Sequence, residues 1–490
     1  MPPDLILVLD EGTTSTRALV FDRRGAIVAS ASRAITQHYP ASGWVEHDAD
    51  ELWQLSRDCL DEAAAAAGID RIACLGITNQ RETIAFWDRT TGAPLAPAIV
   101  WQDRRGADVC AAWRAAGLEP AVQATTGLVL DPYFSASKIV WALANWAAVA
   151  DAAASGTLML GTVDTWLMYK LTGGRVHATD ATNASRTLLM GLSACEWDAG
   201  LVERFGIPRA ALPVITDCAG ALGEAVILGR TIPITGCAGD QHAAAIGQAC
   251  LGAGMVKATF GTGTFVLAHA GAAPPVSAHR LLATLAWRLD GVPAYALEGS
   301  VFTSGAAVQW LRDGVGMIAS AAETEALARS IDDSGGVVVV PAFTGMGAPH
   351  WRADVRGLIT GVTAATTRAH LARATLEAVA HQTADLLDAL AADGVACTRL
   401  RVDGGMAAND WLCQHLADVL GVAVERPRVI ETTALGAAML AGAGAGLFAD
   451  LTEASAMHAI ERVFTPAMAD TARAAGRAAW TRAVRQALTV

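Results

Sequence analysis

The chain has 490 residues, of which 53% are hydrophobic and 17% charged, and its formal net charge is −12. This length is too great for one ordinary hydrophobic core and predicts two domains. The negative balance, with no block of Lys or Arg, argues against a nucleic-acid-binding surface, although a few backbone amides and a metal ion can still bind a small anion.

Residues 5–22, LILVLDEGTTSTRALVFD, predict a buried strand, a polar hairpin and a second strand. Asp10 stands at the end of the first strand, where a carboxylate is costly unless it is paired or bound to a metal. The segment from Gly12 to Thr16 can expose successive N–H and hydroxyl donors to a phosphate. Two interpretations stay open for this segment alone: an ordinary hairpin with a capping Asp, or a phosphate-binding hairpin with Mg²⁺ on Asp10.

The next elements are a helix and another pair of strands. Residues 49–68 place apolar residues on one helical face and offer Gly68 as a C-cap. Residues 71–88 predict a strand, a polar junction and a strand. In this junction Arg81 and Glu82 provide donors and an acceptor that suit a polyol, but a surface ion pair is the simpler interpretation of these two residues alone.

Residues 231–252 predict a strand, a Gly-Asp turn and an Ala-rich helix. Asp240 at the start of this helix is either an N-cap or a general base that takes a proton from an attacking hydroxyl. His242 follows on the same helix, where packing is the expected role of a histidine.

The chain then repeats its opening pattern. Residues 255–270 predict a second strand pair with a Gly-Thr-Gly-Thr tip, about 250 residues after the first, and residues 400–421 add a strand, a Gly-Gly turn and an amphipathic helix. Short strands alternating with helices indicate an α/β fold, and we expect domains at residues 1–250 and 251–490. No G-x-x-x-x-G-K-[ST] motif occurs, which excludes a P-loop protein.

Three features bear on the location of the protein. The uncharged stretch 432–449 reaches the minimum length of a membrane span, but its four glycines and many alanines predict a tightly packed interior helix. No signal peptide is recognisable, because residues 1–4 lack Lys and Arg and Asp10 interrupts the first apolar run. The nine cysteines include no C-x-x-C pair. We therefore expect buried, reduced thiols in a soluble cytoplasmic protein.

Taken together, the motifs resemble the FGGY family of carbohydrate kinases, and within it the members that phosphorylate glycerol. The resemblance covers about residues 5 to 445, with the blocks in order. They are DEGTTSTR (10–17), GWVEHD (43–48), NQRET (79–83), IVWQDRR (99–105), TGLVLDPYFS (126–135), GTVDTWL (161–167), TNASRT (182–187), GDQ (239–241), GTGTF (261–265), the segment 356–377 and RVDGGMAAND (401–410).

This resemblance implies two actin-like and hexokinase-like (ribonuclease H-like) ATPase domains around a central cleft. It implies ATP-dependent phosphorylation of glycerol to sn-glycerol 3-phosphate by in-line transfer, the activity of an ATP:glycerol 3-phosphotransferase of glycerol catabolism. Asp240 is then the catalytic general base. The implied glycerol-binding residues are Arg81, Glu82, Trp101, Tyr133, Asp240, Gln241 and Phe265.

The same resemblance implies ATP and Mg²⁺ as cofactors, with Asp10 as the metal-binding carboxylate. The implied nucleotide-binding residues are Thr13, Thr14, Ser15, Arg17, Thr262, Gly305, Gln309, Gly405 and Asn409. Homodimers or homotetramers are usual in the family, and we expect neither a nucleic-acid partner nor an integral membrane segment.

Two features depart from the family pattern. Glu11 stands where many members have Gln. The segment 223–236 lacks the Gly-rich loop that binds fructose 1,6-bisphosphate in some members and the histidine that is phosphorylated in others, so we expect neither mode of regulation.

Three other functions fit part of the sequence: a kinase for another polyol or for a ketose such as xylulose, an actin- or chaperone-type ATPase, and a non-enzymatic sugar sensor. The NQRET block and Trp101 disfavour the first. The set of polyol-binding residues disfavours the second, and a sensor would not need Asp240.

Overall fold

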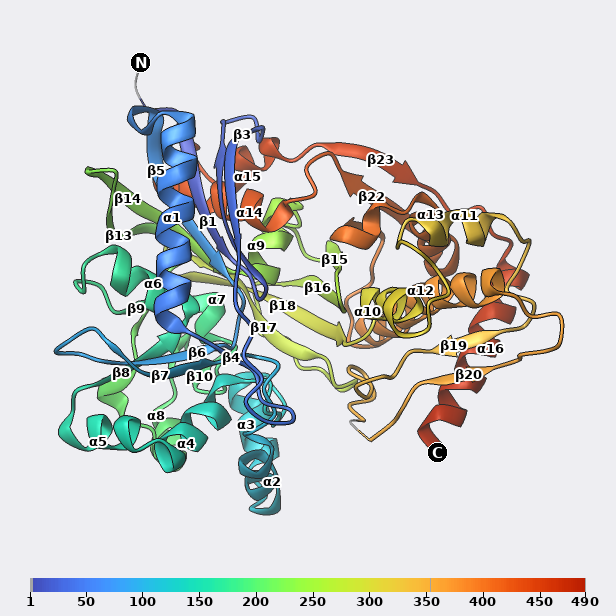
Figure 1. Ribbon diagram of the computed structural model, residues 1–490, viewed down its shortest axis with the longest axis horizontal. Coiled ribbons are helices and arrows are strands. Elements are labelled where there is room, and N and C mark those ends of the chain that lie inside the picture. The colour runs from blue at the N-terminus through green and yellow to red at the C-terminus, as the bar shows by residue number, and fades with distance from the viewer. Residues whose placement is uncertain (1–2, 353, 490) are drawn as a thin grey trace.

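The computed structural model describes residues 3–352 and 354–489, and within them the chain forms two large mixed sheets with helices on their faces (Figure 1). The first sheet has the order β13-β14-β5-β1-β2-β3. Its strands are β13 Ala219–Ile227, β14 Arg230–Gly239, β5 Ile72–Asn79, β1 Leu5–Glu11, β2 Ser15–Phe21 and β3 Ile27–Ala34.

The second sheet repeats this design. Its order is β17-β18-β16-β15-β21-β22-β23, with β17 Leu282–Leu289, β18 Val292–Val301, β16 Thr264–Gly271, β15 Val256–Phe260, β21 Arg399–Asp403, β22 Ala423–Pro427 and β23 Ile460–Phe464. In each sheet three parallel strands are neighbours: β1, β5 and β14 in the first, β15, β21 and β22 in the second. Antiparallel strands flank each trio. The expected repeat of the opening pattern is therefore confirmed, and so is the α/β class.

Strand β1 is buried on both faces, which explains its unbroken apolar run. Leu5, Leu7 and Leu9 pack on one side with α1 (Ala49–Ala67) and α6 (Val163–Leu171). Ile6 and Val8 pack on the other side with α9 (Asp240–Gly247) and α14 (Thr432–Gly444). Side chains alternate across a strand, so a strand between two helical layers needs apolar residues at every position.

Helix α14 comes from the C-terminal half of the chain but covers the first sheet. It crosses α9 where two glycines meet: a Cβ on Gly247 would lie 1.9 Å from the carbonyl oxygen of Thr432, and a Cβ on Gly436 would lie 1.8 Å from that of Ala243. The helix is buried along most of its length, which confirms the predicted interior helix. Among the described residues no helix has the length and hydropathy that crossing a bilayer requires.

A four-stranded sheet extends the first half, at the lower left of Figure 1. Its order is β4-β7-β6-β8, with β4 Glu46–His47, β7 Pro94–Ile99, β6 Ile84–Asp88 and β8 Leu158–Thr162. The helices α2 Ala107–Ala115, α3 Glu119–Thr126, α4 Ser135–Asn145 and α5 Ala147–Ser155 lie beside it. The junction 80–83 thus carries the chain from the first large sheet into this smaller one.

Five further helices of the second half lie around its sheet. They are α10 Gly305–Gln309, α11 Glu323–Arg329, α12 Arg368–Ala392, α13 Asp410–Leu420 and α16 Asp470–Thr489, and β19 Val338–Val340 pairs with β20 Leu358–Thr360. All nine cysteines are free; eight are buried and Cys397 is half-buried. This agrees with the expected buried thiols.

Candidate active site

Three strands of the first sheet end side by side and deliver the candidate residues to one edge. In the register of the sheet, Glu11 of β1 pairs with Asn79 of β5, and Asn79 pairs with Gly239 of β14. The strands are parallel, so the first hairpin, the junction 80–83 and Asp240 all leave the same edge. Ligand sites of parallel sheets form at such carboxyl ends.

Arg81 and Asp240 meet at this edge. Arg81 Nε lies 3.1 Å from Asp240 Oδ1, and the Arg81 side chain is 2% exposed, which rules out a surface ion pair. Gly239 permits the contact, because a Cβ there would lie 2.6 Å from Cγ of Arg81. Asp240 is the first residue of α9, and Gly239 occupies the N-cap position. The N-cap interpretation of Asp240 is therefore wrong; its Oδ1 accepts from the N–H of Gln241 at 2.7 Å, and its side chain is 31% exposed.

A chain of buried charges continues behind this pair. Glu298 of β18 accepts hydrogen bonds from Arg81 (2.5 Å) and Arg186 (2.8 Å), and Arg186 also donates to Glu82 (2.7 Å). Burial opposes ionisation of Glu298, but the charges of Arg186 and Arg81 outweigh burial and lower its carboxyl pKa. Glu298 belongs to the second sheet, so this series of ion pairs joins the two halves of the protein.

The backbone at Glu82 is held in an unusual conformation. Its φ is 62°, and Thr83 N–H donates to the carbonyl of Arg81 across it at 2.7 Å. A residue with a side chain rarely adopts this left-handed region, and such strain concentrates at functional sites. The turn directs the Arg81 and Glu82 side chains into the same buried charge chain.

Three aromatic rings enclose the space next to these residues. The Trp101 ring centroid lies 5.7 Å from that of Tyr133 and 6.2 Å from that of Phe265, both in edge-to-face geometry. Trp101 follows β7, Tyr133 precedes α4, and Phe265 comes from β16 of the second sheet. Burial raises the pKa of the Tyr133 phenol well above its usual value, so this hydroxyl stays protonated.

Gln241 is fixed by a buried lysine. Lys257 of β15 donates to Gln241 Oε1 and, at 2.8 Å, to the hydroxyl of Thr259. Burial lowers the pKa of the Lys257 ammonium group. Lysine has only donors, so the Gln241 carbonyl must face it and the amide nitrogen must face away.

The first hairpin holds Asp10 and Arg17 together. Arg17 Nη2 lies 2.5 Å from Asp10 Oδ2, and Nη1 lies 2.5 Å from Oε2 of Glu431, the residue before α14. Burial raises the pKa of Asp10; Arg17 opposes this shift, whereas the negative charges of Glu431 and Asp240 add to it. At the tip, Gly12 N–H bonds the Ser15 carbonyl at 3.0 Å. Thr14 is exposed and Thr13 and Ser15 are half-buried.

The Glu11 side chain faces α1, which carries Ser56. Its carboxyl group is fully buried and accepts hydrogen bonds from the hydroxyls of Thr16 and Ser56, each at 2.6 Å. Burial raises its pKa to about 8. At neutral pH this side chain is therefore mostly uncharged.

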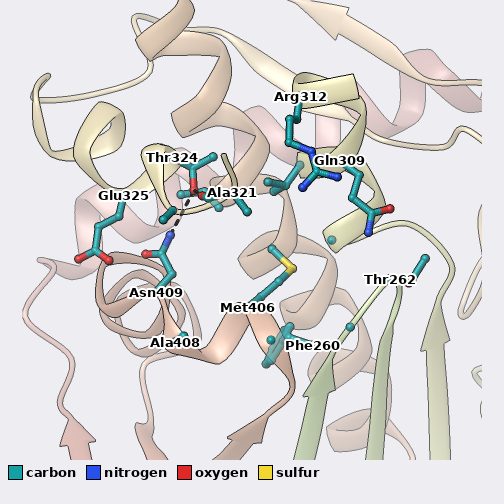
Figure 2. A pocket seen from close by; sticks show the side chains of 16 residues that line it. Phe260, Thr262, Gln309, Arg312, Ala321, Thr324, Glu325, Met406, Ala408 and Asn409 are labelled. Carbon is teal, nitrogen blue, oxygen red and sulfur yellow. Dashed lines mark hydrogen bonds between the residues drawn. The ribbon is translucent and has the colours of Figure 1, made fainter. Parts of the chain in front are cut away.

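A pocket of about 500 Å³ lies in the second half, and all five nucleotide-binding candidates from that half line it (Figure 2). Those five are Thr262, Gly305, Gln309, Gly405 and Asn409. Asn409 also caps α13 through a 2.9 Å bond from Leu412 N–H, and its amide donates to Thr324 at 3.4 Å. Further lining residues absent from the sequence-based set include Arg312, Glu325 and Met406.

Comparison with known proteins identifies the family. Residues 5–247 match the N-terminal domain of the FGGY family of carbohydrate kinases, and residues 256–445 match its C-terminal domain. The chain belongs to the FGGY family of carbohydrate kinases. It is 53% identical to the glycerol kinase of Rhodospirillum centenum over 98% of this chain and 97% of that one. The expected resemblance is thus confirmed.

Solved structures agree with this assignment to the FGGY family. The glycerol kinase of Plasmodium falciparum, solved with ADP, is 36% identical and superposes with a TM-score of 0.93 over 99% of this chain and 98% of that one. A xylulose kinase from Rhodospirillum rubrum is 26% identical, with a TM-score of 0.85 over 99% of this chain and 98% of that one. The expected two-domain fold of actin-like type is confirmed.

Several residues of the site were missed by sequence reasoning. Glu298 and Lys257 each interrupt an apolar strand in a chain with few charges, and that signal could have singled them out. Arg186 lies in the TNASRT block, but no role was expected for it. Glu431 had no distinguishing local pattern, because its partner Arg17 lies 414 residues away. Arg312 pairs with the adjacent Asp313, a pattern that gives no sign of its place in the pocket.

Proposed function

We propose that this protein is an ATP:glycerol 3-phosphotransferase that forms sn-glycerol 3-phosphate. The observation that carries the proposal is the Arg81–Asp240 pair, with Nε and Oδ1 3.1 Å apart, at the strand edge from which the first hairpin also departs. A carboxylate held there by a guanidinium group can meet both a bound hydroxyl and the phosphate to be transferred. The 53% identity to a glycerol kinase supports glycerol as the acceptor.

Glycerol fits the chemistry of the enclosure. Trp101 and Phe265 offer apolar faces to the carbon chain of the triol. Arg81 and the Gln241 amide donate hydrogen bonds, while Tyr133 and Asp240 can bind hydroxyls as well. A site that hydrogen-bonds each hydroxyl rejects analogues that leave its buried groups unpaired.

ATP binds, in this proposal, with its adenosine in the pocket of the second half and its phosphates between the two hairpin tips. Gly261, Thr262 and Gly263 form the second tip, between β15 and β16, and the segment from Gly12 to Ser15 forms the first. Backbone N–H groups and hydroxyls of both tips bind phosphate oxygens. Arg17 adds positive charge beside them.

Asp10 offers the carboxylate oxygens that Mg²⁺ prefers as ligands. It is a buried carboxylate with Glu431 nearby, and Mg²⁺ prefers carboxylate, water and phosphate oxygens. When bound with ATP, the ion offsets the negative charge of the phosphate oxygens. Arg17, which pairs with both Asp10 and Glu431, offsets part of the negative charge of these two carboxylates.

Asp240 acts as the general base of the transfer. The terminal hydroxyl of glycerol gives its proton to the Asp240 carboxylate as its oxygen bonds to the γ-phosphorus, and the bond from that phosphorus to the β,γ-bridging oxygen breaks to release ADP. Arg81 orients the carboxylate throughout. Contacts such as Trp101–Phe265 and Arg81–Glu298 link residues 1–250 with residues 251–490, which we propose as the two domains that enclose the reactants and exclude water.

The test is ADP release from Mg²⁺-ATP by the purified protein, with glycerol, xylulose, gluconate, erythritol and dihydroxyacetone supplied separately. We expect strong dependence on glycerol. Preference for another acceptor would leave the proposed phosphate site and the role of Asp240 intact, but it would overturn the proposal that the aromatic enclosure binds glycerol. ATP turnover that is indifferent to every acceptor would overturn the proposed reaction and favour an actin- or chaperone-type ATPase.

A further inference from the structure

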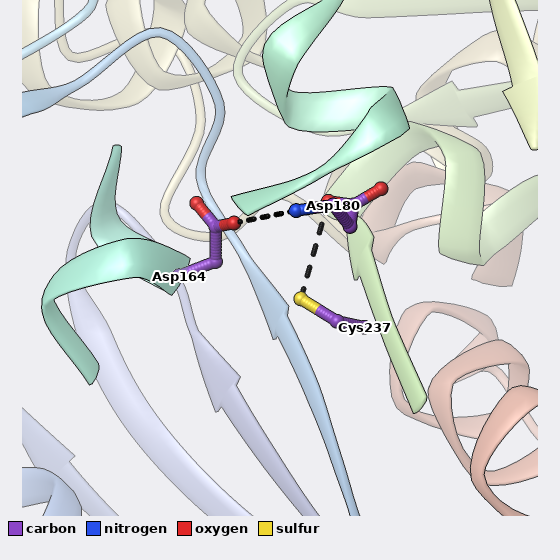
Figure 3. Close-up of side chains that lie close together, drawn as sticks. All are labelled: Asp164, Asp180 and Cys237. Atoms are coloured by element: carbon purple, nitrogen blue, oxygen red, sulfur yellow. Dashed lines mark hydrogen bonds between the residues drawn. The ribbon is translucent and has the colours of Figure 1, made fainter. Parts of the chain in front are cut away.

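A buried acidic cluster lies behind the strand ends that carry Asp240. Asp164 of α6, Asp180 at the end of β9 (Ala178–Asp180) and Cys237 of β14 bring their ligand atoms within 4.8 Å of one another (Figure 3). Burial raises the pKa of both carboxyl groups, and the negative charge of Asp180 raises that of Asp164 further. Two carboxyl groups are costly to bury side by side, so other groups must stabilise them.

Protein donors already surround both carboxyl groups, which argues against a cation. Asp164 Oδ1 accepts from the Thr162 hydroxyl at 2.5 Å, and Oδ2 accepts from the Thr179 hydroxyl at 2.8 Å and from Asp180 N–H at 3.2 Å. Asp180 Oδ2 accepts from the Cys218 thiol at 3.3 Å. Every carboxylate oxygen has a donor within the protein, so the cluster is a hydrogen-bonded anchor.

Asp180 is connected to the backbone next to Asp240 by hydrogen bonds through Thr182. Thr182 lies in α7 (Ala181–Ala184), and its N–H and hydroxyl both donate to Asp180 Oδ2 at 2.6 Å. The single hydroxyl proton is used there, so Thr182 Oγ1 can only accept from a third group. That group is Gly239 N–H, at 2.9 Å, directly before Asp240.

A second branch leads from Asp180 to the end of β5. Asn183 Nδ2 donates to Asp180 Oδ1 at 2.7 Å and to Asn79 Oδ1 at 3.0 Å, and Asn79 Nδ2 donates back to Asn183 Oδ1 at 3.1 Å. Asn79 Nδ2 also bonds the carbonyl of Gln80, next to Arg81, at 2.9 Å. The two branches thus end on the backbones that carry the two partners of the 3.1 Å ion pair.

We propose that Asp180 is a positioning residue for phosphoryl transfer: through Thr182 and Asn183 it holds the ends of β14 and β5 so that Asp240 and Arg81 meet the acceptor hydroxyl. The proposal rests on the proposed function and adds residues that touch no substrate. Its physical basis is that each bond of the two branches has one possible direction of donation. Loss of one acceptor therefore leaves a buried N–H without a partner and lets the strand end shift.

The test compares isosteric variants of buried threonines. Thr182→Val removes the acceptor of Gly239 N–H, whereas Thr182→Ser keeps it. Thr235→Val is the matched control. Thr235 lies in β14, the strand that also contains Gly239, and is 5% exposed. Its hydroxyl donates to the carbonyl of Ala441 in α14 at 2.8 Å. Turnover with glycerol, KM for ATP, ADP affinity and melting temperature are measured for each protein.

Thr182→Val is expected to lower kcat by about 10- to 100-fold, because a small misplacement of a reacting group has such an effect. ADP affinity stays unchanged, since the pocket lies in the other half, and Thr182→Ser restores most of the turnover. Thr235→Val loses stability but keeps its kcat. A folded Thr182→Val with normal kcat, or an equal loss of kcat in Thr235→Val, would overturn the proposal.

If Thr182→Val does not fold, Asp180→Asn tests the positioning role instead. This variant changes one carboxylate oxygen to an NH₂ group at nearly constant volume. It is expected to lower kcat and to leave ADP affinity unchanged; normal kcat would overturn the proposal. The wild-type protein is assayed in parallel. Absence of glycerol-dependent turnover there refutes the proposed function, whereas normal wild-type turnover with unaffected variants refutes the positioning role alone.

Discussion

The indole Nε1 of Trp101 donates a 2.9 Å hydrogen bond to the hydroxyl of Thr13. One residue belongs to the aromatic enclosure and the other to the first hairpin, so the bond links the two regions that we propose bind the acceptor and the phosphates. The backbone N–H of Trp101 is fixed as well, by the hydroxyl of Thr83 at 3.1 Å.

This link predicts energetic coupling between the two residues. Trp101→Phe and Thr13→Val each remove the bond, so the double variant should lose less than the sum of the single losses. The coupling energy in kcat/KM should be about 1 kcal/mol, the typical value of one hydrogen bond. Steady-state kinetics of the four proteins measures it. Strictly additive losses would contradict a functional link.

Asp240→Asn should lower turnover by roughly 10²- to 10⁴-fold, the usual contribution of a positioned general base. The amide keeps the shape of the side chain but cannot take the proton. ADP affinity, measured by calorimetry, should change little, because the pocket of the second half is untouched. Near-normal turnover in this variant would remove Asp240 from the role of base.

Glu298→Gln should reduce kcat/KM for glycerol by roughly 10- to 100-fold, the equivalent of one charge-assisted hydrogen bond. A glutamine can accept from only one side, so either Arg81 or Arg186 loses its partner and the Arg81–Asp240 geometry relaxes. The readout is kcat/KM for glycerol together with KM for ATP, which should stay near its wild-type value.

Glu425→Gln is the matched control for this change. Glu425 is equally buried and also accepts from two arginines, Arg399 at 2.5 Å and Arg401 at 3.1 Å, but it lies in β22, away from Arg81. Both variants should melt at lower temperature. If both also lost glycerol affinity equally, the effect would be one of stability and not of positioning.

Glu11→Gln should stabilise the protein increasingly as pH rises from 5 to 8. The folded-state pKa of Glu11 is about 8, whereas an unfolded glutamate ionises near 4.5, so within this window the unfolded chain releases a proton that the folded chain keeps. Wild-type stability from this group is complete below the lower value and is lost as pH rises toward the higher one. Glutamine has no such proton.

The difference between the proteins should reach the order of a few kcal/mol at pH 8. Urea-unfolding midpoints at pH 5, 6.5 and 8 measure it, with Glu62→Gln, an exposed glutamate, as the control. A constant offset at all three values would show that the folded-state pKa of Glu11 is ordinary.

Gly405→Leu should block nucleotide binding without unfolding the chain. Gly405 lines the 500 Å³ pocket, and no heavy atom lies within 4 Å of the position of an added Cβ. The leucine would therefore fill space that the adenosine occupies in our proposal. We expect at least a tenfold loss of ADP affinity with an unchanged melting temperature; unchanged affinity would place the adenosine elsewhere.

Local patterns were sufficient to predict the elements and the family. The apolar runs of β1 and β15 and the Gly/Thr tips that follow them are short-range features, and each formed the expected element. The expected Gly-Asp turn did not form as a separate element, because β14 ends at Gly239 and α9 begins at Asp240. Strand propensity, turn chemistry and helix periodicity act over a few residues, so they can be read from the chain directly. The quoted motifs then pointed to the FGGY family.

Only the tertiary structure decided which distant residues share the site. Arg81 and Glu82 read locally as a surface ion pair, yet both are buried. Glu298, more than 200 residues away, pairs with Arg81, and Arg186, about 100 residues away, pairs with Glu82. Arg17 and Glu431 are 414 residues apart and meet because α14 crosses to the first sheet. A charge can be buried only when such a partner offsets it. The packing of the two halves against each other, not sequence distance, brings these partners together.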